Sequence, residues 1–110
     1  MAELHIVRDH SLGLAAARRM AFRWAELVEQ DYGMQCEYAE SRQGDEVRFE
    51  RSGVVGTLDV SKDRFELRAK LGLLVGTFKD RIEREIVQQL DAMLAQAQAA
   101  EPKPRRSRGA

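Results

Sequence analysis

The sequence has little that cross-links or stiffens a chain. Cys36 is the only cysteine, so no disulfide can form within the chain, and the only two prolines lie in the last ten residues. The first ten residues, MAELHIVRDH, lack the apolar core of a signal peptide. These features are typical of a reducing compartment, and we expect a cytoplasmic protein.

Long uncharged apolar runs are also missing. Charged residues interrupt every candidate before it reaches the roughly 20 residues needed to span a bilayer, so we expect no transmembrane segment. Lys plus Arg and Asp plus Glu number 18 each, so no net charge attracts nucleic acid or an acidic membrane. We therefore expect no specific nucleic-acid partner.

The length of 110 residues is that of one domain, which we place at 1–97. We expect residues 98–110 to form a disordered basic tail, because they lose large apolar side chains and gain both prolines. The basic residues of the tail could touch nucleic acid or anionic lipid, but no aromatic accompanies them to stack on a base. A solvating tail is the simpler interpretation of Lys103, Arg105, Arg106 and Arg108.

Apolar periodicity predicts a short strand over ELHIVRD and a helix from Leu14 to Val28. Asp9 and Ser11 are candidate helix caps, and Gly33 is a candidate left-handed stop. Trp24 lies in the middle of the apolar stripe. Phe22 falls on the opposite, polar side and is predicted to be an exposed aromatic.

Four alternating runs follow, separated by turn residues at 41–44, 52–53 and 61–64. If these are the loops, one row of the sheet aligns Tyr38, Val47, Leu58 and Leu67, and the next aligns Cys36, Phe49, Gly56 and Ala69. Both rows face the same side, and a glycine leaves room for the aromatic ring beside it. Because a slip by one residue would turn a whole strand over, this agreement among three turns supports the register.

A last helix is predicted from Thr77 to about residue 97, with Thr77 and Asp80 at capping-box spacing and an apolar stripe that includes Phe78 and Ile82. The order indicates an α+β fold with two layers, β-α-β-β-β-β-α, a mostly antiparallel sheet and both helices on one face. We favour the edge beside 65–71 for the first strand. The edge beside 34–40 is the alternative.

Three motifs resemble catalytic or metal-binding patterns without fitting them. GLLVGTFK has three residues between its glycines and a displaced lysine, so it does not match a phosphate-binding loop. The DHS at 9–11 places triad residue types side by side, where they cannot converge, and helix capping is the better account. His5 and His10 lack neighbouring ligand-type residues in the sequence, so structural roles are favoured over a metal site.

The predicted register places Glu46, Asp59 and Glu66 side by side on the wet face of the sheet. Such a row could hold a hard cation or raise the pKa of one of its members. Alternatively, Arg48 and Arg68 in the flanking row neutralise it. We favour neutralisation, and expect no metal, no cofactor and no catalytic residue.

Three segments, RDHSLGLAAAR, YGMQCEY and RSGVVGTLDVSKDRFELRAKLGLLVGTFKDRIEREI, resemble the polyhydroxyalkanoic acid system family. Members of this family are typically encoded beside polyhydroxyalkanoate synthases and granule-associated proteins. The resemblance implies a cytoplasmic role in the formation, maintenance or regulation of storage granules. It supplies no catalytic residues.

Two classes of function remain. The first is a non-catalytic accessory protein that binds a polyhydroxyalkanoate granule, a granule-associated protein or a second copy of itself. Its predicted partner-binding residues are Leu73, Leu74 and Val75, of which at least one should cap the core and at least one should be exposed, together with Phe22. The alternative is a small hydrophobic-ligand binder or weak enzyme with a helix-grip-like pocket, although few polar groups are expected on the inner face.

Overall fold

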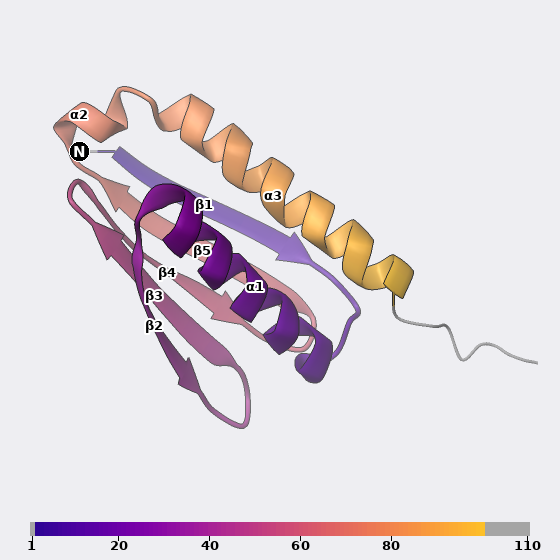
Figure 1. The fold of residues 1–110 in the computed structure, drawn as a ribbon. Coiled ribbons are helices and arrows are strands. Elements are labelled where there is room, and N and C mark those ends of the chain that lie inside the picture. The colour runs from indigo at the N-terminus through magenta and orange to yellow at the C-terminus, as the bar shows by residue number, and fades with distance from the viewer. Residues whose placement is uncertain (1, 101–110) are drawn as a thin grey trace, which may run out of the picture.

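The computed structural model describes residues 2–100, so the predicted tail from residue 101 onward lies outside the described part (Figure 1). The strands are β1 (Ala2–Asp9), β2 (Gln35–Glu40), β3 (Asp45–Arg51), β4 (Val54–Val60) and β5 (Arg64–Leu71). The helices are α1 (Leu14–Tyr32), α2 (Leu73–Gly76) and α3 (Lys79–Ala100). The predicted α+β order is confirmed, with α2 as an additional single turn.

The five strands form one antiparallel sheet in the order β1-β5-β4-β3-β2. The favoured placement of the first strand, beside β5, is therefore correct. Both predicted rows are also confirmed: Tyr38, Val47, Leu58 and Leu67 align in one, and Cys36, Phe49, Gly56 and Ala69 in the next. β1 extends these rows with Ile6 and Leu4. The helices α1 and α3 both run across this apolar face, as Figure 1 shows.

The centre of the core is an aromatic pair. The rings of Trp24 on α1 and Phe49 on β3 meet edge to face, with centroids 5.3 Å apart, and both side chains are buried. A Cβ atom at Gly56 would lie 2.5 Å from the Phe49 ring and 2.5 Å from the backbone oxygen of Arg68. Glycine at position 56 is therefore what allows the Phe49 ring to pack against β4.

The predicted caps of α1 are wrong. The residue that precedes the helix is Gly13, and no side chain caps the helix start. β1 continues through Asp9, and the backbone amides of His10 and Gly13 then bond to the carbonyls of Asp63 and Lys62 in the β4–β5 turn. This attachment holds Asp9 in the strand instead of over the helix. The predicted stop is correct, because Gly33 adopts the left-handed conformation with φ of 67°.

The start of the last helix also differs from the prediction. The Thr77 hydroxyl donates backward to the carbonyl oxygen of Leu74 at 2.7 Å, so the capping box with Asp80 is wrong and α3 begins at Lys79. Phe78, expected on the inner stripe, is exposed because it precedes this helix. The inner stripe itself packs on the core through Ile82, Ile86, Leu90 and Met93. The helix runs to Ala100, past the predicted domain boundary at residue 97.

Replacing Phe49 with alanine should lower the free energy of unfolding by about 3–5 kcal/mol, because the change removes a buried ring and leaves a cavity beside Trp24. Urea unfolding of the purified protein measures this directly. The matched control is Val55→Ala on the same sheet, at an exposed position on the other face, where the loss should stay below about 1 kcal/mol. Equal losses at the two positions would contradict the role assigned to Phe49.

Candidate functional site

The junction between β5 and α3 presents three large apolar side chains to solvent. Leu73 is 79% exposed, Leu74 is 85% exposed and Phe78 is 58% exposed. Val75, on the same helical turn, packs instead against the core. The expectation that one member of this segment caps the core while others remain exposed is confirmed. We call Leu73, Leu74 and Phe78 the apolar lip.

Glycines position the lip. The Gly72 amide donates to the Gly53 carbonyl at 2.8 Å, and the Gly76 amide donates to the Gly72 carbonyl at 2.7 Å, which closes the turn of α2. Gly53 has a positive φ of 86°, and a Cβ atom there would come within 2.8 Å of the Val75 side chain. The β3–β4 turn therefore lies directly against α2 and holds Val75 inward and the two leucines outward.

Phe22 is exposed, as predicted, but one face of its ring is covered. It stacks on Tyr38 of β2 with centroids 4.1 Å apart and planes 5° apart. α2 contacts β1 and β5, which lie at the opposite edge of the sheet from β2. The structure therefore does not bring Phe22 together with the lip.

Behind that stack lies a polar cluster that sequence analysis missed. Asp45, at the start of β3, is only 4% exposed and accepts hydrogen bonds from the Arg18 guanidinium at 2.9 and 3.0 Å and from the Tyr38 hydroxyl at 2.8 Å. Burial, and then the bond to Asp45, raise the pKa of Tyr38 far above its ordinary value. An aspartate beside a turn gives no sequence signal of burial, so the pairing could not be read from the chain.

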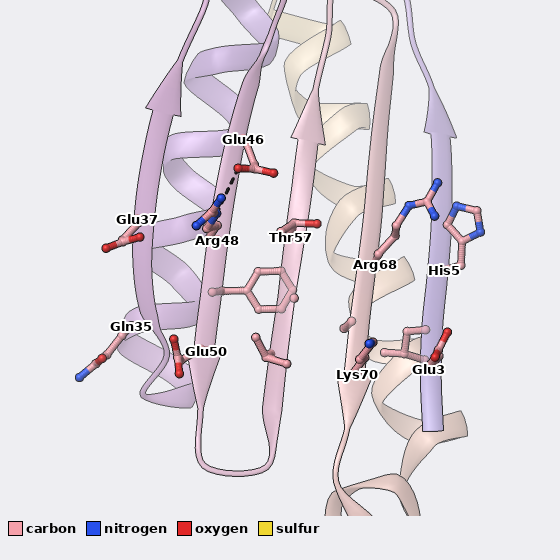
Figure 2. A pocket seen from close by; sticks show the side chains of 15 residues that line it. Glu3, His5, Gln35, Glu37, Glu46, Arg48, Glu50, Thr57, Arg68 and Lys70 are labelled. Atoms are coloured by element: carbon pink, nitrogen blue, oxygen red, sulfur yellow. Dashed lines mark hydrogen bonds and ion pairs between the residues drawn. The ribbon is translucent and has the colours of Figure 1, made fainter. Parts of the chain in front are cut away.

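The other face of the sheet is uncovered and carries the predicted acidic row. Glu46, Asp59 and Glu66 are direct neighbours across β3, β4 and β5. Arg48 bonds to Glu46 at 3.2 Å, while Arg68 and His5 reach Glu66 at 2.7 and 2.6 Å. Figure 2 shows this face with Arg48 turned toward Glu46 and with His5 beside Arg68. The basic side chains thus neutralise the two ends of the row.

The ion pairs affect the members of the row differently. The bonds from His5 and Arg68 lower the pKa of Glu66, whereas partial burial and the charges of Glu46 and Glu66 raise the pKa of Asp59. Across residues 2–98, no three His, Cys, Asp or Glu side chains are grouped so that they could hold a metal ion together. The two ends of the row are therefore ion-paired, and the repulsion falls on Asp59 in its middle.

The second histidine serves packing. His10 is buried against the ring of Phe65 at a centroid distance of 4.6 Å, and its Nδ1 atom accepts the Leu12 amide at 3.1 Å. Burial lowers the pKa of His10, so the neutral ring is favoured.

A cavity of about 310 Å³ lies between the two long helices and the sheet. Its walls are mainly apolar and include Trp24 and Val28 of α1, Leu71 of β5 and Ile82 and Ile86 of α3. Val75 of α2 and Ser52 and Val54 of the β3–β4 hairpin also line it. Tyr32, Glu85 and Gln89 also line the cavity. These polar residues were not predicted there, because they lie at the borders of the apolar stripes of their helices.

These features define a two-layer α+β domain with an apolar lip and an apolar cavity between its helices and its sheet. A family model described as "putative polyhydroxyalkanoic acid system protein" matches residues 4–94. The chain belongs to this family. No curated protein and no solved structure matches it. No helix among the described residues is long and apolar enough to cross a membrane.

Removing the charge of Asp59 should stabilise the domain at neutral pH. Asp59→Asn relieves the repulsion from Glu46 and Glu66, and we expect a gain of up to about 1 kcal/mol in unfolding free energy. Because the fold raises the pKa of Asp59, the destabilisation is present when the group is charged and disappears as the pH falls below about 4. The gain should therefore be seen in urea unfolding at pH 7 and vanish at pH 3.

Thermal unfolding with added cation separates repulsion within the row from cation binding by the row. Millimolar magnesium or calcium should leave the melting temperature of the wild-type protein unchanged. A clear rise in melting temperature with either cation would show that the row binds a cation. A loss of stability in Asp59→Asn at pH 7 would contradict the repulsion assigned to the row.

Proposed function

We propose that this protein is a non-catalytic accessory protein of the polyhydroxyalkanoate storage-granule system, and that it attaches to the granule surface through the apolar lip. In this proposal it acts in the cytoplasm, where the granule presents an oily surface to water. The observation that carries the proposal is the exposure of Leu73 and Leu74 on a single anchored turn.

The family supports the setting, because its name ties the chain to polyhydroxyalkanoic acid. Such a polyester is rich in aliphatic groups, and burying leucine and phenylalanine against it removes apolar surface from water on both sides. Clustered exposed apolar side chains, such as the two leucines of α2, usually mark an interaction site.

The size of the lip favours a surface over a folded protein partner. A stable protein–protein interface buries roughly 800 Å² on each side, contributed by about 20–30 residues. The lip offers three large apolar side chains at one end of the sheet, where α2 projects beyond β5 (Figure 1). Three side chains suit insertion into a soft apolar surface better than a shaped interface.

The polar clusters support a non-catalytic role. Asp45 is occupied by Arg18 and Tyr38, and Glu46 and Glu66 are held by arginines on an open sheet face. General acid–base catalysis needs a titratable group held in a site that excludes water. The solvated face of the sheet does not provide such a site.

Replacing both lip leucines with aspartate should weaken granule binding by about tenfold or more, since a fully buried leucine is worth about 1.5–3 kcal/mol. Purified protein is mixed with isolated polyhydroxyalkanoate granules, and the bound fraction is measured by sedimentation over a range of granule concentrations. The Leu73→Asp/Leu74→Asp variant should keep its melting temperature, because both side chains are already in water.

Val55→Asp is the matched control, since it places the same charge at an exposed valine on the open sheet face. Sedimentation equilibrium of both variants tests self-association. Wild-type granule binding by the double variant would refute the proposal. Loss of a dimer with unchanged binding to protein-free polyester particles would identify a second copy of the chain as the partner instead.

A further inference from the structure

The cavity between the helices and the sheet is larger than packing alone explains. Protein interiors are close-packed, with few voids larger than a water molecule. This cavity has a volume of about 310 Å³, which lies within the usual range for ligand pockets of about 300–1,000 Å³. An empty apolar space of this size costs stability, because the wall atoms lose contacts.

Two buried polar atoms on cavity-lining residues have no hydrogen-bond partner within the described structure. They are the indole Nε1 of Trp24, a residue only 1% exposed, and the amide Oε1 of Gln89. Buried polar atoms are nearly always paired, and an orphan weakens the fold. A ligand in the cavity would supply the missing partners.

The chemistry of the two atoms is complementary. The indole nitrogen is a donor only, and the amide oxygen is an acceptor only. The Tyr32 hydroxyl donates its proton to Glu85 at 3.4 Å, so it accepts from the Gln89 amide nitrogen at 2.8 Å and the amide oxygen is left without a partner. A hydroxyl group can accept from Trp24 and donate to Gln89 at once, whereas a hydrocarbon can do neither.

The remaining walls define the rest of the ligand. Val28, Leu71 and Ile86 offer only apolar contact, so the body of the ligand should be aliphatic. The charged residues on the lining are Arg51, which bonds to the Tyr32 carbonyl, and Glu85, which pairs with Arg81. Opposite charges on the lining favour neither a cationic nor an anionic ligand.

We propose that this cavity binds a medium-length aliphatic molecule that carries a hydroxyl group, with the hydroxyl between Trp24 and Gln89. At about 30 Å³ for each water-sized group, the space admits roughly ten non-hydrogen atoms. The site is separate from the apolar lip and does not depend on granule attachment.

Trp24 is the only tryptophan in the chain, so its fluorescence reports on the site directly. The full-length protein is titrated with 1-octanol and with 1-chlorooctane, which has the same chain length but no hydroxyl. We expect 1-octanol to change the Trp24 emission, to raise the melting temperature and to bind about tenfold more tightly than 1-chlorooctane. No response to either probe would overturn the proposal.

Two variants test the geometry. Gln89→Leu removes the acceptor and should abolish the preference for 1-octanol while retaining the binding of 1-chlorooctane. Ile86→Phe adds volume to the cavity wall and should lower the affinity for both probes by about tenfold or more. Should Ile86→Phe fail to fold, Gln89→Leu still decides, because an unchanged preference for 1-octanol in that variant would overturn the assigned hydroxyl contact.

The lip variant separates this site from the proposed granule contact. Leu73→Asp/Leu74→Asp should bind 1-octanol as the wild type does, even where it no longer binds granules. Equal affinity of the wild-type protein for the two probes would show an apolar cavity without hydroxyl recognition and would overturn the proposal, while leaving granule binding by the lip unaffected.

Discussion

The in-phase alternation of five antiparallel strands is the constraint on which the rest of the structure depends. It collects the large apolar side chains on one face, where Phe49 meets Trp24, and the charged side chains on the other. A shift of one strand by one residue would turn its outward side chains into the core and its apolar side chains into solvent. Gly56 is part of this constraint, because the Phe49 ring occupies the space that a side chain at position 56 would fill.

This constraint explains why the sheet was predictable from sequence. Turn residues at three places fixed the loop lengths, and the resulting rows contained only apolar or small residues on one side, which no other register provides. The edge beside β5 was favoured for β1 over the edge beside β2, and in the structure Leu4 and Ile6 continue the rows of Ala69 and Leu67. The acidic row on the opposite face was predictable for the same reason.

What sequence could not give depends on how separate elements meet. Thr77 has the spacing of a cap, but its hydroxyl bonds backward because Leu74 belongs to a helical turn of its own. The buried ion pair of Arg18 and Asp45 joins residues 27 positions apart across two layers. The cavity likewise depends on the separation of two helices above the sheet, and no local pattern records that distance. That part of the segment Leu73, Leu74 and Val75 is exposed was predictable because a turn has one inward side, whereas the exposure of Phe78 was not predicted.

The short helix α2 contributes to both the apolar lip and the cavity. Its outward side carries Leu73 and Leu74, while its inward residue, Val75, forms part of the cavity wall against the β3–β4 turn. A single helical turn of four residues therefore carries the exposed leucines on one side and a residue of the cavity wall on the other. A side chain at position 53 would collide with Val75, so glycine there sets how closely the β3–β4 turn approaches the inner side of this helical turn.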